Sequence, residues 1–198
     1  MKWLACVASL ALLTPWSAAQ DNQDKPGPGL DVPAQDVLKP GLIGQYWNVG
    51  KEMKKFPVDL VCDPATVCHI DRVLDFDVKE GRGFKDIPWT EYFAVVWTGV
   101  LRVPNDAEYT FTLKSLDGST LCLDGKLIVD RDGTCPAEET ASKAVTMNAG
   151  DHEIRVEYFQ NKEGRCILSW KFEGAEKHVI PSTAFWHRFE KGLDLEAK

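Results

Sequence analysis

Residues 93–130, FAVVWTGVLRVPNDAEYTFTLKSLDGSTLCLDGKLIVD, decide the fold of this chain. From Tyr109 to Ser115 apolar and polar residues alternate strictly, which is the pattern of a β-strand with one face buried and one face in water. The pair Asp124-Gly125 lies between two short extended runs and is typical of a tight β-hairpin turn. The stretch therefore predicts strands at residues 93–103, 109–115, 119–123 and 126–130.

The same period of two continues on the C-terminal side. Residues 152–159 (HEIRVEYF) alternate again, and residues 165–172 (RCILSWKF) close the series. Turn signals separate the runs at Asn105-Asp106, Asp117-Gly118, Asp132-Gly133, Ala149-Gly150 and Glu163-Gly164. Many short strands at this spacing predict an all-β fold, a sandwich or barrel of antiparallel strands. Only residues 182–191 have a pattern that allows a short helix, with Ser182 or Thr183 as its N-cap.

The N-terminus has the features of an export signal. Lys2 precedes an apolar run, and Ser17-Ala18-Ala19 forms a small-residue cleavage site, so residues 1–19 are expected to be a signal peptide cleaved after Ala19. The alternative is an uncleaved anchor. No later stretch approaches the roughly 20 apolar residues of a membrane span. The sequence predicts a secreted, extracellular protein without membrane insertion.

Composition divides the rest of the chain. Residues 20–40 are polar and rich in proline and glycine, which predicts a disordered linker. The β-sandwich domain is expected at residues 41–189, with a C-terminal tail at 190–198. The formal net charge of the chain is -7, and removal of the signal takes away one lysine and no acid, which gives -8. An acidic domain repels phosphate backbones, so nucleic acid is not an expected partner.

Removal of the signal also leaves an odd number of cysteines for an oxidising compartment. Cys62 and Cys68 enclose a short loop and are expected to pair with each other. The pairing of the other three stays open, and the leftover cysteine either joins two chains as a disulfide-linked dimer or lies buried. The disulfide candidates are Cys62, Cys68, Cys122, Cys135 and Cys166.

The order of these motifs resembles the protective-antigen-like (PA-fourteen) family of domains. The chain has GLIGQYW at 41–47, then the stretch 93–130, then NAGDHEIRVEYFQNKEGRCILSWKF at 148–172 and VIPSTAFW at 179–186. The resemblance covers about Gly41 to Trp186. It implies a β-sandwich, and it implies binding, because the family includes carbohydrate-binding modules attached to glycosidases and sugar-binding adhesins. The expected function is therefore recognition of carbohydrate by a secreted, lectin-like module.

The resemblance also implies where a ligand would bind. In the sugar-binding adhesins, two adjacent aspartates in the turn that matches residues 115–119 hold a calcium ion, and sugar hydroxyls complete its coordination. Here Leu116 replaces the first aspartate and Asp117 remains, which removes a ligand and a charge and weakens the case for calcium. Asp117 is then the one candidate metal ligand, and Asp132 and Asn161 on neighbouring loops complete the candidate ligand site. Asp117, Asp130 and Asp132 can equally be turn-forming residues.

Two further groups of residues bear on function. Trp89, in the irregular stretch DIPWTEY, is a candidate for stacking on a sugar, although it can also cap one end of the core. Asp75 and Asp77 would share a strand face and form the one carboxylate pair that a glycoside hydrolase could use, but such acids are usually solvated. The histidines form no metal-ligand spacing. We therefore expect no enzyme. The alternative to glycan binding is a structural module that binds an extracellular protein, as a disulfide-linked oligomer.

Overall fold

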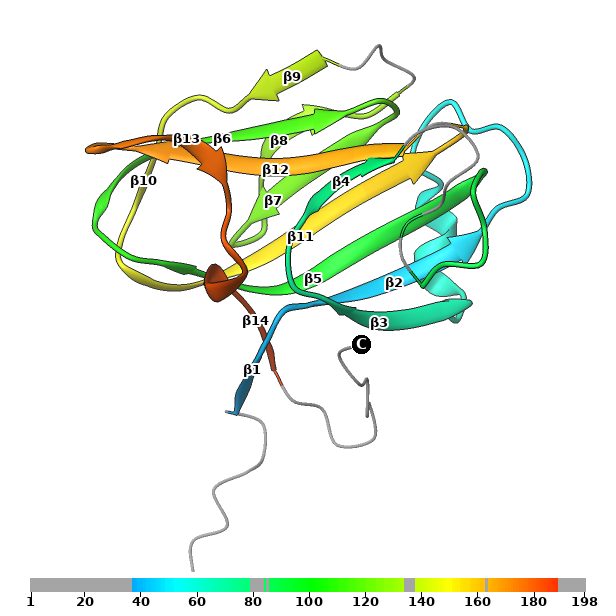
Figure 1. Ribbon diagram of the computed structural model, residues 1–198, viewed down its shortest axis with the longest axis horizontal. Helices are drawn as coiled ribbons and strands as arrows, with labels where there is room; N and C mark the ends of the chain where they lie inside the picture. Colours follow the sequence, from blue (N-terminus) through cyan, green and yellow to red (C-terminus); the bar gives the residue numbers. More distant parts are fainter. Residues whose placement is uncertain (1–36, 79–83, 85, 134–137, 163, 189–198) are drawn as a thin grey trace, which may run out of the picture. The chain divides into compact units, whose positions relative to one another are not determined.

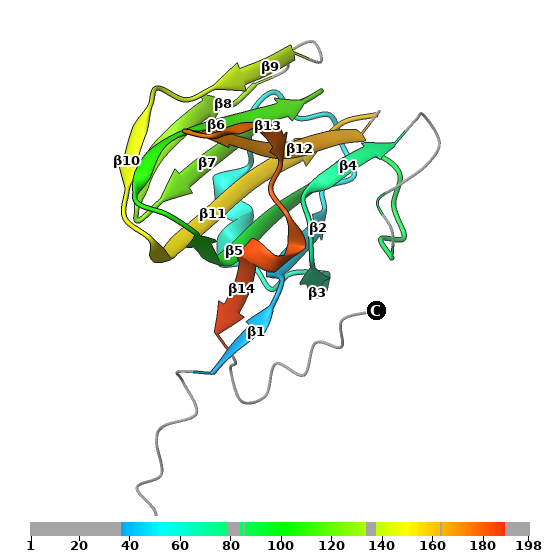
Figure 2. The ribbon, with the colours of Figure 1, turned by 60° about the vertical axis from the view of Figure 1, so that its left-hand side comes forward.

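The predicted strand at residues 93–103 is β5, Phe93–Val103, the longest strand together with β11, Gly150–Gln160. It is hydrogen-bonded to β11 on one side and to β2 and β14 on the other, always antiparallel. The computed structural model describes residues 37–78, 84, 86–133, 138–162 and 164–188. In this part of the chain two antiparallel sheets face each other, so the all-β prediction is confirmed (Figures 1 and 2).

The larger sheet has eight strands among the described residues. Its main path runs in the order β1-β14-β5-β11-β7-β8, and β2, which pairs with β5, also pairs with β3. Besides β5 and β11, its strands are β1 (Leu38–Pro40), β2 (Leu42–Asn48), β3 (Val67–Asp71), β7 (Ser119–Leu123), β8 (Lys126–Arg131) and β14 (Phe185–Arg188).

The smaller sheet has six strands in the described part of the chain. Its path is β10-β6-β12-β13, with β4 added to β12 and β9 added to β6. Two short 3-10 helices, η2 (Val58–Cys62) and η3 (Ser182–Ala184), lie in the connections. The strands are β4 (Asp75–Val78), β6 (Ala107–Ser115), β9 (Glu138–Ala141), β10 (Val145–Met147), β12 (Gly164–Phe172) and β13 (Ala175–Val179).

The core lies between the two sheets because the alternation of the strands directs their apolar side chains there. Trp97 of β5 and Tyr109 of β6 are fully buried in it, and Trp170 of β12 is nearly so. Gly99 of β5 has a steric role. A Cβ atom at this position would lie 2.3 Å from the backbone oxygen of Trp186, so only glycine allows β14 to pass this closely.

A second, smaller apolar cluster lies on the outer side of the eight-stranded sheet. The segment of residues 49–66, which connects β2 to β3, lies along this side (cyan in Figures 1 and 2). Its Met53 and Phe56 pack with Ala94, Val96 and other residues of the sheet. Strand β5 is therefore buried on both faces, which explains its nearly continuous apolar sequence.

Two boundaries differ from the sequence prediction. Residues 38–40, expected in the linker, form β1 and pair with β14. Residues 182–191 were expected to be helical, but Phe185–Arg188 form β14, and only Ser182–Ala184 make a 3-10 turn. Pairing with β5 and β1 overrides the weak local helix preference. The predicted signal peptide 1–19 and the tail 190–198 lie outside the described residues, as does most of the predicted linker.

The cysteines give a further difference. Cys62, Cys68, Cys122 and Cys166 have free thiols in the structure, so the expected bridge between Cys62 and Cys68 is not formed there. Cys122 lies on β7 among residues that alternate with the core positions, whereas Cys166 of β12 is fully buried in the main core. The sheet separates these two side chains, which excludes a bridge between them. Cys135 lies outside the described residues.

The described residues contain no helix that is long and apolar enough to cross a membrane.

Candidate functional site

The three candidate ligand residues come from three loops at one end of the sandwich. Asp117 lies in the turn between β6 and β7, Asp132 follows β8, and Asn161 follows β11. The carboxylate of Asp117 accepts hydrogen bonds from the backbone N–H of Asn161 (2.7 Å) and from its Nδ2 (3.3 Å). Gly118 allows the close approach of the Asp132 turn, because a Cβ there would lie 2.6 Å from the nitrogen of Gly133.

The polar atoms of these residues bind the chain's own backbone. Asn161 makes two bonds to Met53, accepting from its N–H at Oδ1 (2.7 Å) and donating from Nδ2 to its carbonyl oxygen (2.9 Å). Oδ1 of Asp132 accepts from the N–H of Phe56 (2.8 Å). Residues 51–56 thus lie directly over the position where the sequence placed a ligand. We call residues 51–56 the covering segment.

The free energy of opening decides whether the covering segment can leave. Met53 and Phe56 are 5 % and 6 % exposed, and exposing them would cost about 2 kcal/mol each. The three hydrogen bonds to Asn161 and Asp132 contribute about 1 kcal/mol each. These contacts oppose opening, and the backbone freedom that the segment would gain on opening offsets part of them. The closed form is the surface that a ligand meets.

The electrostatics of Asp117 follow from the same contacts. Burial raises the pKa of this carboxyl, the hydrogen bonds from Asn161 lower it, and the nearby Glu52 raises it, with a net upward shift. Both carboxylate oxygens already accept N–H groups, and the side-chain oxygen of Asn161 is also engaged. In the described part of the chain no three His, Cys, Asp or Glu residues are grouped so that they could hold a metal ion. The pair of adjacent aspartates that the adhesin type of calcium site uses is absent from this turn, because Leu116 stands beside Asp117.

Trp89 lies beside this end but does not stand free. It is half-buried and packs against the main core, as expected for a residue that caps one end of it. Gln160, fully buried, donates from Nε2 to the carbonyl oxygen of Thr90 (2.6 Å), which fixes the segment that contains Trp89. The backbone oxygen of Tyr92 in turn accepts from Val49 N–H (2.8 Å) at the start of the β2–β3 connection.

The remaining acidic candidates have structural partners or lie in water. Asp77 of β4 forms an exposed ion pair with Arg165 (3.0 Å), and Asp75 on the same strand is exposed. Asp130 accepts a hydrogen bond from the N–H of Asp132 (3.1 Å), which is the turn role considered from sequence. Asp71, which is not one of these candidates, has a buried carboxylate. Its Oδ2 accepts hydrogen bonds from Tyr46 Oη and Trp97 Nε1, each at 2.7 Å.

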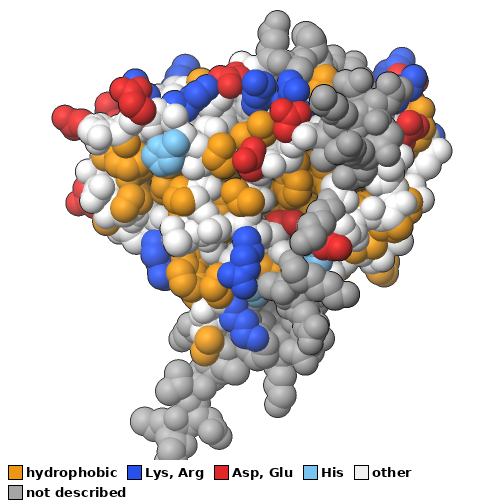
Figure 3. Space-filling view, in the orientation of Figure 1, with side chains coloured by type: hydrophobic (Ala, Val, Ile, Leu, Met, Phe, Trp, Pro, Cys, Tyr) orange, Lys and Arg blue, Asp and Glu red, His pale blue; other side chains and the backbone are white. Residues whose placement is uncertain are grey.

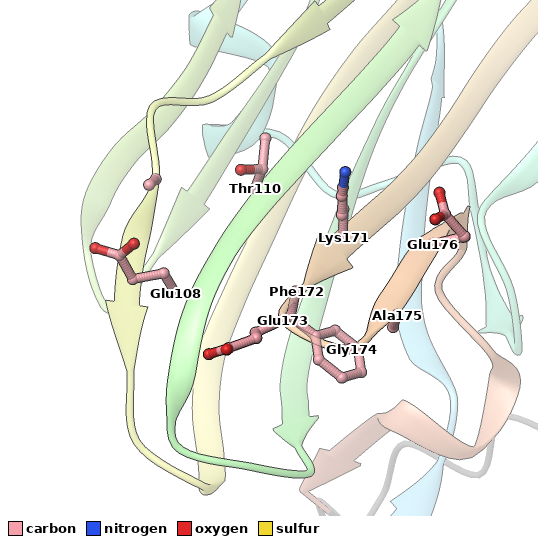
Figure 4. Close-up of a pocket in the computed structure, with 9 residues that line it drawn as sticks. Glu108, Thr110, Lys171, Phe172, Glu173, Gly174, Ala175 and Glu176 are labelled. Carbon is pink, nitrogen blue, oxygen red and sulfur yellow. The ribbon is translucent and has the colours of Figure 1, made fainter.

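A separate hollow of about 640 Å³ lies over β6 and β12 and beside the turn that leads to β13 (Figure 4). Three of its four ionisable side chains are glutamates, so it disfavours an anionic ligand. Charged side chains of both signs are interspersed along the upper edge of the face in Figure 3. The residues that line the hollow are Glu108, Thr110, Ala144, Lys171, Phe172, Glu173, Gly174, Ala175 and Glu176.

Sequence reasoning did not identify the covering segment. Its residues, KEMKKF, have no period of two and contain four charged residues out of six. The one signal was the pair of apolar residues, Met53 and Phe56, in an otherwise polar stretch. Their partners, Asn161 and Asp132, are more than 70 residues away, and nothing in the local sequence connects them.

Comparisons with known proteins agree with this fold. Over 148 residues, 74% of this chain and 21% of the relative, the sequence is 30% identical to the anti-sigma-I factor RsgI3 of Acetivibrio thermocellus. The structure of an anti-sigma factor domain-containing protein from Clostridium clariflavum superposes with a TM-score of 0.64 at 24% identity, covering 77% of this chain and 49% of that one. The chain thus spans between a fifth and a half of these two relatives.

A sugar-binding domain shares the fold over nearly its whole length. The structure described as the PA14 sugar-binding domain from an RTX adhesin superposes with a TM-score of 0.64 at 16% identity, covering 75% of this chain and 98% of that one. The model of the family described as the PA14 domain matches residues 38–184, which contain both sheets except the last strand. This chain therefore belongs to the PA14 domain family.

Proposed function

We propose that this protein is a secreted module that binds carbohydrate at the end of the sandwich where residues 51–56, 117, 132 and 161 meet. The observation that supports the proposal most is the fold, which the chain shares with a domain described as sugar-binding. The loops at this end come from both sheets and are held together by Asn161, so they offer a rigid surface. Rigid loops lose little conformational entropy when a ligand binds.

In this proposal the contacts to the sugar are direct and need no calcium. The oxygens of Asp117 and Asn161 are engaged with N–H groups of the chain. Sugar hydroxyls would instead meet the exposed side chains of the covering segment. Recognition would be an equilibrium of hydrogen bonds, without a chemical step, and Asp75 and Asp77 would take no part.

A glycan array with and without a calcium chelator tests this function. We expect binding to a restricted set of glycans that the chelator does not change. Binding that disappears with the chelator would contradict the direct contacts, and no binding in either condition would exclude a glycan-binding module. The export of the protein is tested separately by N-terminal sequencing of the mature chain, which we expect to begin at Gln20.

Asp75 and Asp77 give the test of the catalytic alternative. We expect no hydrolysis of a glycoside panel by the wild-type chain. Hydrolysis that is abolished by Asp77→Ala, with the fold intact by circular dichroism, would show that the carboxylate pair is catalytic.

A further inference from the structure

The side chains of the covering segment point in two directions. Met53 and Phe56 point into the apolar cluster on the outer side of the eight-stranded sheet. The four residues that remain, Lys51, Glu52, Lys54 and Lys55, are all exposed. Because the backbone between them is bound to Asn161 and Asp132, these charged side chains start from fixed points on the surface.

The charge of this segment is opposite to that of the chain. Three lysines and one glutamate give the segment a net charge of +2, whereas the chain as a whole has -7. Within the described residues, no ion pair is formed by Lys51, Lys54 or Lys55. Screening limits the reach of a charge to about 8 Å at physiological ionic strength, so a ligand bound here senses the lysines and the acids beside them more than the net charge of the whole chain.

Two carboxylates, those of Asp132 and Asp117, lie beside the covering segment and affect which ligands it prefers. One oxygen of Asp132 accepts the Phe56 N–H, and Asp117 accepts two bonds from Asn161, so neither carboxylate is fully available to a ligand. Glu52 is exposed and near enough to Asp117 to raise the pKa of that carboxyl. Glu52 is the one acidic residue of this segment, and it would repel an anionic ligand.

From these contacts we infer that the covering segment binds a carboxylated polysaccharide through Lys51, Lys54 and Lys55. The inference rests on the proposed glycan-binding function and specifies its ligand class. A neutral sugar offers these ammonium groups only hydroxyl oxygens, whereas a uronate polymer offers a repeated series of carboxylates. Several weak ion pairs along one polymer act together, so they give useful affinity although each exposed pair is weak.

The experiment is a binding titration of the full chain with polygalacturonate, with a neutral galactan and with double-stranded DNA, at 0.05 and about 0.5 M salt. The variant Lys51→Gln/Lys54→Gln/Lys55→Gln removes the three charges. Its matched control, Lys126→Gln/Lys143→Gln/Lys171→Gln, removes three charges from exposed lysines elsewhere. Glu52→Gln changes the same surface in the opposite direction, and circular dichroism checks the fold of each variant.

We expect the wild-type chain to bind polygalacturonate more tightly than the neutral galactan, and high salt to remove most of this preference. The triple covering-segment variant should bind polygalacturonate about tenfold more weakly, Glu52→Gln up to about fivefold more tightly, and the control within about twofold of wild type. Equal loss in both triple variants would overturn the inference, as would equally tight binding of DNA. Binding of the neutral galactan alone would overturn the inference and leave the proposed function intact, whereas binding of no glycan would refute both.

Discussion

Replacing Asn161 with alanine tests whether this side chain holds the covering segment in place. The variant loses two hydrogen bonds with Met53 and one with Asp117, all made by a side chain that is 8 % exposed. At about 1 kcal/mol for each bond, the loss is about 3 kcal/mol. For a domain of this size that corresponds to a fall in Tm of about 6–12 °C. It should also release the backbone of the covering segment.

The assay is thermal and urea unfolding, combined with amide hydrogen exchange of Met53 and Phe56. We expect the Met53 amide, which donates to Asn161, to lose protection strongly in Asn161→Ala. Asn105→Ala is the matched control, because its exposed side chain makes no hydrogen bond within the described residues. A Tm within about 2 °C of wild type, with unchanged exchange of Met53, would show that Asn161 does not hold the covering segment.

Three other predictions concern separate parts of the molecule. Burial lowers the pKa of His152. Its hydrogen bonds to the Asp124 carboxylate (2.7 Å) and the Asn148 carbonyl (2.9 Å) raise this pKa by more than burial lowers it, so the net shift is upward. Protonated His152 therefore stabilises the fold fully below about pH 6.5, and this stabilisation is lost as the pH rises through the folded-state pKa. In His152→Gln, the urea midpoint should no longer fall over this pH range. Burial raises the pKa of the Cys166 thiol far above its usual range, whereas Cys62 is exposed. Mass spectrometry after alkylation of the native protein should find Cys62 modified and Cys166 modified only after unfolding. Resistance of Cys62 to alkylation until the protein is reduced would show that Cys62 is in a disulfide. Gly99→Ala should destabilise the domain by about 1–3 kcal/mol, because its Cβ would lie 2.3 Å from the backbone oxygen of Trp186; an unfolding midpoint equal to that of wild type would show that β14 can move aside.

Much of the fold could be predicted because strand alternation is a local property. The strands around Tyr109 and Val156 are amphipathic, and the Asp124-Gly125 turn reverses the chain within two residues. The short strands at the two ends of the domain were missed, because β1 and β14 have only three and four residues and no strong pattern of their own. They are strands because each completes the hydrogen bonds of a neighbour.

The contacts within the candidate site, in contrast, could not be predicted from the sequence. The sequence identified Asp117, Asp132 and Asn161 as loop residues with oxygen atoms, and the structure places them at the same end of the sandwich. The sequence could not show that these oxygens accept hydrogen bonds from N–H groups of the chain itself. The bond from Met53 to Asn161 spans 108 residues, so it exists only when β2, β5 and β11 have paired in the eight-stranded sheet.

The sequence by itself determined that this chain is a β-sandwich of the PA14 type, because its strands, turns and motif order are written in residues that lie close together. The tertiary structure alone decided what the loop end of the sandwich presents to a ligand. Met53 and Phe56 turn inward to cover Ala94 and Val96, and this burial leaves the lysines of the covering segment outside and the Asp117 carboxylate beneath. The physical reason is that apolar burial against a distant strand, and not local preference, fixes which side of the segment faces water.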